Sequence, residues 1–215
     1  MGCSNPHPHG QIWALDYVPS EPMKVMKSMY DFSADPANEH APGPRHPHGR
    51  PHLLLAYAHM ELHAPGRPRI VTLNDDFVAL VPFWAVWPFE IMVLPYKRFL
   101  GSLQDLTDAE IASLAHILGE VTCRYDNLFR TSFPYSMGIH QKPVSHAQDS
   151  LALYALFHIH FYPPLLRSAT VGNSLLGRLF TRFTDIRFEM MAEPQRDITA
   201  ESAAERLRAC DTTHY

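Results

Sequence analysis

Apolar and polar side chains alternate along residues 153–162. Every second side chain from 155 to 161 is apolar, and His158 and His160 stand between them. Because successive side chains of a strand point to opposite faces, this segment predicts a strand with one buried face and one imidazole-bearing face. Such a strand must belong to a sheet that packs one of its faces against an apolar layer. This requirement excludes more fold classes than the composition does. The apolar positions are Ala155, Phe157, Ile159 and Phe161.

Further strands are predicted from short apolar runs that are bounded by turn-forming residues. A turn at residues 74–76 predicts that the strands on either side of it pair with each other. Another strand is expected to follow the Pro-rich and Gly-rich opening of the chain. The ranges are 10–18, 69–73, 77–81, 90–94 and 134–141.

One long helix is predicted from a capping box at residues 107–110. The Thr107 hydroxyl and the Glu110 carboxylate can each accept a hydrogen bond from a free N–H group at the helix start. The helix is expected to run to about Phe129 and to bury one stripe of apolar side chains. The expected stripe consists of Ile111, Leu114, Ala115, Leu118 and Val121.

These elements predict an α+β fold in which antiparallel strands pack on one long helix, without a βαβ rhythm. Residues 19–68 show little pattern and are expected to form an irregular Pro- and His-rich connection, with a helical stretch near 53–62. A last helix is expected at 199–209. We therefore divide the chain into an opening strand at 1–18, a connection at 19–68 and a domain at 69–215.

Composition excludes several classes of protein. The net charge of −4 disfavours a general grip on nucleic-acid phosphates, so no nucleic-acid partner is expected. Three cysteines without a C-x-x-C pair exclude a disulfide framework and favour a cytoplasmic protein. The apolar run 77–89 is interrupted by Pro82 and Pro88, so no membrane association is expected.

Histidine is abundant, with 14 in 215 residues. His158 and His160 share one strand face, and His140 at the end of the expected neighbouring strand can complete a three-histidine site for zinc or iron. The alternative is a set of partly exposed polar histidines on a sheet, which the residues alone leave open. His7 and His9 form a second pair, which Pro8 stiffens. The same tetrapeptide at 46–49 is interpreted as a solvated loop.

Several segments together resemble the galactose-1-phosphate uridylyltransferase family of the histidine-triad superfamily. The match begins with Gly-Cys-Ser-Asn-Pro-His-Pro-His-Gly-Gln-Ile-Trp at 2–13 and covers most of 1–19 and 69–171. It includes Ser-Phe-Pro-Tyr-Ser-Met-Gly at 132–138, His-Ile-His-Phe-Tyr-Pro-Pro at 158–164 and Glu-Pro-Gln-Arg-Asp at 193–197. The resemblance implies a histidine-triad-like half-barrel sheet.

The resemblance also implies a reaction in two steps, in which UDP-glucose gives UMP to a histidine and galactose-1-phosphate then accepts it. His9 matches the nucleophile, and the N–P bond of a uridylyl-histidine is labile enough for onward transfer. Matches to substrate-contacting positions are Gly2, Cys3, Ser4, Gln11 and Gln195. The family is a cytoplasmic homodimer whose active site draws on both subunits.

For metals, the resemblance implies zinc and a second metal, iron or zinc. His7 matches a ligand of the first, and His140, His158 and His160 match ligands of the second. The second metal's carboxylate ligand aligns with Val25, and Glu21 is the nearest substitute.

The sequence also departs from the family, because the N-terminal half that precedes this segment, with its C-x-x-C pair, is not in it. We therefore expect an incomplete chain of the transferase, from an incomplete gene model rather than a natural fragment, that transfers UMP poorly by itself. The alternatives are a catalytically inactive metal-binding or dimerisation domain and a small nucleotide hydrolase.

Overall fold

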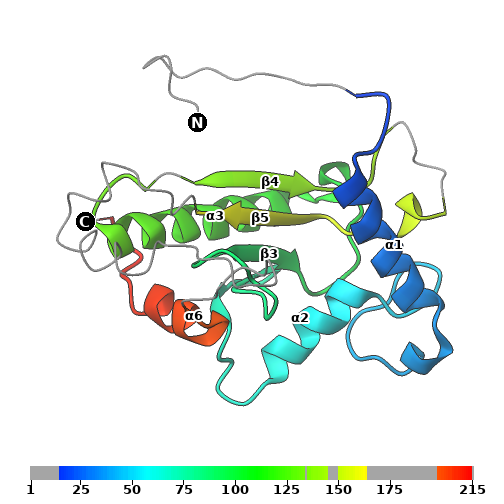
Figure 1. Cartoon of the computed structure of the whole chain (residues 1–215), viewed down its shortest axis with the longest axis horizontal. Coiled ribbons are helices and arrows are strands. Elements are labelled where there is room, and N and C mark those ends of the chain that lie inside the picture. Colours follow the sequence, from blue (N-terminus) through cyan, green and yellow to red (C-terminus); the bar gives the residue numbers. More distant parts are fainter. Residues whose placement is uncertain (1–14, 134, 145–149, 164–197, 215) are drawn as a thin grey trace, which may run out of the picture.

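The computed structural model describes residues 15–133, 135–144, 150–163 and 198–214 (Figure 1). In these residues, two helices precede the strands, one long helix lies between the third and fourth strands in the sequence, and one helix follows the last strand. The helices are α1 (Ser20–Ala34), α2 (Leu53–His63), α3 (Asp108–Phe129) and α6 (Ala200–Arg208). The strands are β1 (Ile70–Leu73), β2 (Phe77–Leu80), β3 (Ile91–Pro95), β4 (Ser136–His140) and β5 (His158–Tyr162). Short 3₁₀ turns are η1 (Pro36–Asn38), η2 (Leu103–Asp105) and η3 (Ala152–Tyr154).

The strands form one antiparallel sheet in the order β1-β2-β3-β5-β4. β5 is inserted between β3 and β4, so that His160 pairs with Met92 on one side and with Gly138 on the other. The long helix α3 crosses behind the sheet, whereas α1 and α2 lie at its other side (Figure 1). The predicted α+β class, with an antiparallel sheet packed on one long helix, is confirmed.

The α3 face of the sheet carries the larger core. Ile117, Val121 and Tyr125 of α3 are fully buried against the apolar side chains of β5. The Tyr125 hydroxyl donates a hydrogen bond to the Phe89 carbonyl at 2.6 Å, so the one polar atom of this buried ring is satisfied. The β5 side chains in this core are Ile159 and Phe161, with Phe157 directly before the strand.

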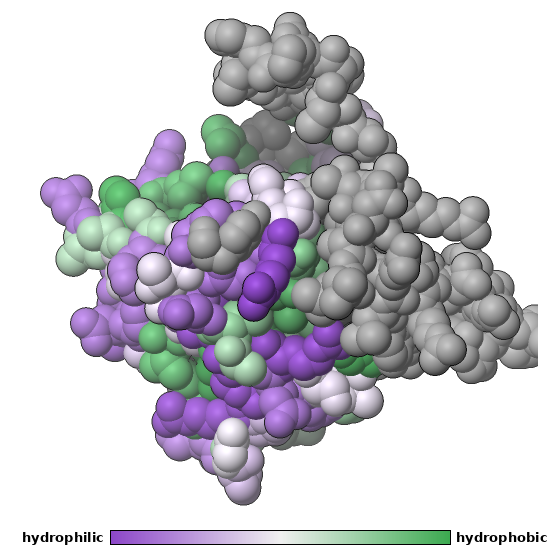
Figure 2. All heavy atoms as spheres, turned by 90° about the vertical axis from the view of Figure 1, so that its left-hand side faces the viewer, coloured by the Kyte–Doolittle hydropathy of each residue, from purple (hydrophilic) through white to green (hydrophobic). Residues whose placement is uncertain are grey.

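The other face carries a second core beneath α1 and α2. Met29 of α1 and Leu55 of α2 are fully buried there, and both pack with Leu80 of β2 and Leu94 of β3. Because both faces of β2 and β3 are covered, these strands are buried along their whole length. On the side of the molecule that Figure 2 shows, apolar residues emerge only in small areas between hydrophilic ones.

The start of α3 follows the capping prediction. Thr107 Oγ1 accepts from Glu110 N at 3.3 Å, and the Glu110 carboxylate accepts from Thr107 N at 2.8 Å. Of the predicted stripe, Leu114 and Val121 are buried and Leu118 is half-buried, whereas Ile111 is 51% exposed and Ala115 is also exposed. Their places are taken by Ile117, Tyr125 and Leu128, which the prediction omitted.

Three other expectations differ from the structure. Residues 15–18, the described part of the strand expected at 10–18, do not form a strand. The strand expected at 153–162 begins only at His158, because residues 152–154 form the turn η3. The connection 19–68, expected to be irregular, contains α1 as well as the expected α2. The apolar face of α1 was missed because it is narrow: its buried positions are Met26, Met29 and Ser33. Within the part of the chain that the structure describes, no helix is long and apolar enough to cross a membrane.

Candidate metal-binding histidine face

Three imidazoles meet on the face of the sheet opposite α3. His140 of β4 pairs in register with His158 of β5, and their rings stack at 4.7 Å between centroids. The His160 ring stands edge-on to both, at 5.3 Å from each. A Cβ atom at Gly138 would lie 3.4 Å from His140 Nε2, so the glycine leaves room for this ring to lean over the strand. The three histidines therefore lie on one face of the sheet, as a shared metal site requires, and their convergence on one metal stays a prediction.

The environment keeps two of these imidazoles neutral. His158 Nδ1–H donates to the Leu156 carbonyl at 2.8 Å, so Nε2 is the unprotonated nitrogen of the neutral ring. Burial lowers the pKa of His158 to about 3, and burial also lowers the pKa of His140. A neutral imidazole whose second nitrogen is fixed by a carbonyl is the form that binds metal ions.

The surroundings of His160 differ from those of the other two rings. Its Nδ1 is buried without a hydrogen-bond partner in the described residues, and the nearest acidic atom is Glu90 Oε1 at 3.5 Å. The other carboxylate oxygen of Glu90 accepts from the backbone N–H groups of Val86 and Trp87 at 3.2 and 3.4 Å. Glu90 was not among the candidate site residues that the sequence predicted. Its position, directly before a buried strand, could have indicated a buried carboxylate. It is 5% exposed.

A cavity of about 340 Å³ opens beside the histidines. Its sheet side includes Gly138, His140 and His158, and its α1 side includes Val25 and Met29. Val25 therefore faces the cavity that the histidines line. Glu21 does not line this cavity, and its carboxylate accepts from Lys24 Nζ at 2.7 Å on the exposed side of α1. The arrangement seen therefore does not place Glu21 beside the histidines.

The imidazoles of the three histidines and the nearby carboxylate are ligand types that zinc and iron bind in proteins. As the side chains stand, however, the described ranges contain no group of three or more His, Cys, Asp or Glu residues placed to hold a metal ion. Metal binding would require a change in the side-chain orientation of the three imidazoles, which already lie on the same face of the sheet.

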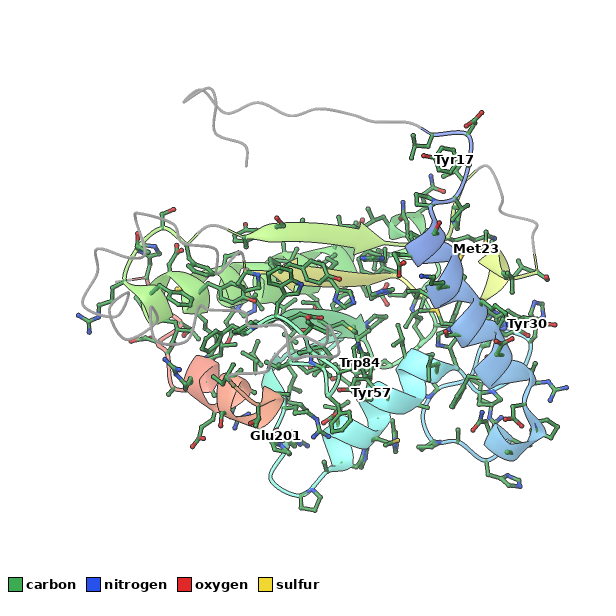
Figure 3. All side chains as sticks on the ribbon, in the orientation of Figure 1. Tyr17, Met23, Tyr30, Tyr57, Trp84 and Glu201 are labelled. Atoms are coloured by element: carbon green, nitrogen blue, oxygen red, sulfur yellow. The ribbon has the colours of Figure 1, made fainter. Side chains whose placement is uncertain are left out.

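Two more histidines fix the segment that leads into β5. His46 Nε2–H donates to the Leu153 carbonyl at 3.0 Å, and His52 Nε2–H donates to the Tyr154 carbonyl at 2.9 Å. The His46 ring also stacks on Tyr154, which Tyr30 of α1 meets edge-on at 5.4 Å (Tyr30 is labelled in Figure 3). The interpretation of 46–49 as a solvated loop is therefore wrong for His46, which is 4% exposed, and right for His48.

A second polar cluster joins α2, which packs in the core on the histidine side, to α6, which packs in the core on the α3 side. Arg69 Nε donates to Glu61 of α2 at 2.7 Å, and Arg69 Nη1 donates to Glu201 of α6 at 2.6 Å. Beside it, Tyr57 and Trp84 lie together, with ring centroids 4.6 Å apart (Figure 3). This cluster connects chain segments and includes none of the predicted site residues.

The remaining predicted site residues lie outside the described residues, so the structure does not position them relative to the histidine face. They are Gly2, Cys3, Ser4, His7, His9, Gln11 and Gln195.

Comparisons with known proteins agree on one family. The model of the galactose-1-phosphate uridyl transferase C-terminal domain matches residues 38–215, and that of the N-terminal domain matches residues 1–19. Galactose-1-phosphate uridylyltransferase of Kluyveromyces lactis is 50% identical over 100% of this chain and 51% of that protein. The Haemophilus influenzae protein of the same name is 44% identical over 100% of this chain and 53% of its own length.

Solved structures agree with this result. A uridylyltransferase superposes with a TM-score of 0.66 and 25% identity, over 97% of this chain and 56% of the other. An ADP-glucose phosphorylase of Arabidopsis thaliana shares the fold, with a TM-score of 0.62 and 18% identity over 93% of this chain and 51% of that one. The chain spans about half the length of the relatives it matches. On these matches, the chain belongs to the galactose-1-phosphate uridyl transferase family.

Proposed function

We propose that this chain provides the active-site segment and C-terminal half of a UDP-glucose–hexose-1-phosphate uridylyltransferase. The observation that carries the proposal is an identity of 43–50% to relatives with this activity in their names, over the whole of this chain. Because those relatives are about twice as long, complete activity requires the other half.

His9 would act as the nucleophile. Its neutral imidazole nitrogen attacks the α-phosphorus of UDP-glucose, an N–P bond forms, and the bond to glucose-1-phosphate breaks. The phosphate oxygen of galactose-1-phosphate then attacks the same phosphorus, which releases His9 and forms UDP-galactose. Stabilisation of the charge on the phosphoryl oxygens supplies most of the rate enhancement in such transfers. The groups proposed to contact phosphate or substrate are Gly2, Cys3, Ser4, Gln11 and Gln195.

His140, His158 and His160 are proposed to hold one metal ion, zinc or iron. Their shared face, the neutral rings of His140 and His158 and the fixed Nδ1 of His158 support this proposal. A bound ion would tie β4 to β5 and so stabilise this part of the sheet. His7 would contribute to a separate zinc site, with further ligands from outside this chain. Homodimerisation and a cytoplasmic location are also proposed, from family membership.

Metal content tests the metal proposal. The purified chain is expected to bind about one equivalent of zinc or iron, measured by elemental mass spectrometry after dialysis. His158→Ala should abolish the binding, whereas His116→Ala, at an exposed position on α3, should leave it unchanged. Equal metal content in all three proteins would contradict the assignment of these ligands.

Covalent labelling tests the transfer. UDP-glucose carrying ³²P at the α-phosphorus is mixed with the chain alone and with the chain co-expressed with the unmatched half of the Kluyveromyces lactis relative. Little adduct is expected from the chain alone, because a positioning error of about 1 Å can cost about 10²-fold in rate. The combined halves should form a uridylyl adduct.

The chain contains a matched control for the nucleophile. His48 occupies the same place in the tetrapeptide 46–49 as His9 in 7–10, but it lies on an exposed loop. His9→Gly should abolish the adduct, and His48→Gly should retain it. An adduct that persists after His9→Gly would refute His9 as the nucleophile. A stable adduct on the chain alone would refute the requirement for the other half.

A further inference from the structure

The carboxylate of Glu90 is buried beside the histidine face without a permanent cation to pair with. Glu90 directly precedes β3 and is 5% exposed. No Lys or Arg of the described residues lies within ion-pair distance of it, and the group that does is His160, whose Nδ1 is 3.5 Å from Glu90 Oε1. Burial of a carboxylate is costly unless hydrogen bonds satisfy its oxygens. The two oxygens of Glu90 therefore have to be accounted for separately.

One of these oxygens closes a turn of the backbone. Oε2 accepts from Val86 N and Trp87 N at 3.2 and 3.4 Å, and Glu90 N donates to the Trp87 carbonyl at 3.0 Å. The turn follows Trp84, which is labelled in Figure 3. Because the turn holds Oε2, it also orients the whole carboxylate and leaves Oε1 to face His160.

The backbone directly before Glu90 is strained. Phe89 has a φ of 61°, in the left-handed region that residues with a side chain seldom adopt. Its ring is fully buried, and its carbonyl accepts from the Tyr125 hydroxyl at 2.6 Å. Strain of this kind persists only where the surrounding structure enforces it, and it is concentrated at functional sites. The contacts of Phe89 therefore fix the place of Glu90 beside β5.

The His160 ring has two orientations that would preserve its packing. It stacks on Tyr162, with ring centroids 5.3 Å apart and an angle of 6° between the planes. A half-turn about the Cβ–Cγ bond would keep this stacking but would move both ring nitrogens, so a polar neighbour has to select one orientation. Glu90 Oε1 faces Nδ1, which has no hydrogen-bond partner in the described residues. An approach of about 0.5 Å would give the pair ordinary hydrogen-bond length.

We propose that Glu90 is the positioning residue of the histidine face: it accepts a hydrogen bond from His160 Nδ1–H and so leaves Nε2 unprotonated as the metal-binding atom. His158 is held in the same tautomer by the Leu156 carbonyl. Partners of this kind fix the tautomer and orientation of metal-binding imidazoles. Glu90 lies on the β3 side of β5, whereas His140 lies on the β4 side, so Glu90 would act through His160. The metal, but not the tautomer, rests on the proposed function.

Glu90→Gln tests the tautomer. The amide oxygen can still accept from Val86 N and Trp87 N, so the turn is retained, but the NH₂ group then faces His160 and can only donate. It would donate to Nδ1, so the neutral ring would carry its proton on Nε2. Long-range ¹H–¹⁵N NMR of the metal-free chain, at about pH 8 and thus above the ordinary histidine pKa, reads this directly. The unchanged chain should show Nδ1–H, and Glu90→Gln should show Nε2–H.

Metal affinity tests the consequence. The zinc affinity of Glu90→Gln, measured by competition with a chromophoric chelator, should be about 10- to 100-fold lower than that of the unchanged chain. Glu61→Gln is a matched control, because Glu61 is 2% exposed but pairs with Arg69. It should alter neither the His160 tautomer nor the zinc affinity. Circular dichroism and thermal unfolding of each variant show whether the fold is retained.

The tautomer of the unchanged chain can by itself overturn the proposal, without any variant: a proton on His160 Nε2 would do so. The proposal also fails if Glu90→Gln keeps both the tautomer and the affinity. A loss of affinity without a change of tautomer would show that Glu90 only supports the turn, which contradicts the proposal as well. If the tautomer reverses but the unchanged chain binds no metal, the proposed metal site fails and the control of His160 by Glu90 stands.

Discussion

The long helix α3, with α6 packed beside it, covers one face of the sheet, whereas α1, α2 and the loop that carries His46 and His52 cover the histidine face. On the α3 face, Ile117, Val121 and Tyr125 come from a single periodic stretch and meet apolar side chains. On the histidine face, α1 and α2 cover an apolar area, and His46 and His52 fix the turn that leads to His158. Apolar packing dominates the first face, whereas the second also depends on buried imidazoles.

This difference has a consequence for stability. Apolar packing does not titrate, so the α3 face should keep its contribution across the whole neutral and mildly acidic range. Buried neutral imidazoles resist protonation, so acid should destabilise the histidine face first. The contrast between the faces can therefore be measured with single substitutions at matched positions.

The largest effect is expected from Phe157→Ala, on the α3 face. The ring is fully buried in the larger core and meets Phe77 edge-on, with ring centroids 6.4 Å apart. Its removal leaves a cavity and should reduce the free energy of unfolding by about 3–5 kcal/mol. Urea unfolding followed by circular dichroism measures this loss, which should be the same at pH 7.5 and pH 5.5. A loss below about 1 kcal/mol would show that the core on this face collapses around the gap.

The next effect concerns His52, on the histidine face. Burial lowers its pKa from 6.5 to about 4. Between those values the unfolded chain binds a proton that the folded chain does not. Stability is therefore complete above about pH 6.5 and is lost as the pH falls toward 4. The loss should be on the order of 2–3 kcal/mol.

His52→Gln tests this pH dependence, because the amide can still donate to the Tyr154 carbonyl but cannot be protonated. Urea unfolding at pH 7.5, 5.5 and 4.5 should show a shallower decline for the variant than for the unchanged chain. The remaining decline would come from other buried histidines, such as His46, whose pKa burial also lowers. Parallel declines for the two proteins would exclude His52 as a source of acid sensitivity.

A smaller effect is expected from Glu110→Gln, at the start of α3. Arg98 donates to both carboxylate oxygens, at 2.7 and 2.6 Å, and this pairing lowers the pKa of Glu110 to about 2. The stabilisation is therefore present above about pH 4.5 and is lost as the pH falls through 2. The variant should lose about 1–2 kcal/mol, because Arg98 is half-exposed. The difference should be equal at pH 7.5 and 5.5, and a difference that shrinks in this range would contradict the assignment.

The smallest effect is expected from Ile111→Ala. This residue belongs to the stripe that periodicity predicts, but it is 51% exposed in the structure. The change should alter the free energy of unfolding by less than about 0.5 kcal/mol. Ile117→Ala, at a fully buried position of the same helix, should cost about 2–5 kcal/mol. Similar costs at the two positions would mean that the first turn of α3 packs against a layer beyond the described residues.

Local interactions made part of the fold predictable. The capping box at Thr107 and Glu110 depends on residues three apart, and the alternation around His158 and His160 depends on residues two apart. Both therefore appear directly in the order of the residues. The same alternation indicated that the two histidines share a face, and the place of His140 at the end of the expected neighbouring strand extended the set to three. The residues named for phosphate and hexose contacts came from the resemblance alone, and they stay predictions.

Contacts between distant segments could not be predicted in the same way. Periodicity indicates which side chains share a face, but it does not indicate which other segment covers that face. Glu90 reaches His160, and His46 reaches the Leu153 carbonyl, only because strand pairing and loop packing bring residues far apart in the chain together. The narrow apolar face of α1 acquires its role in the same manner, from the apolar area of the sheet that it covers. The order of residues thus specifies the helices, the strands and the faces that their side chains share. Long-range packing specifies which polar groups become buried partners, because that choice depends on strand register and burial rather than on neighbours in the chain.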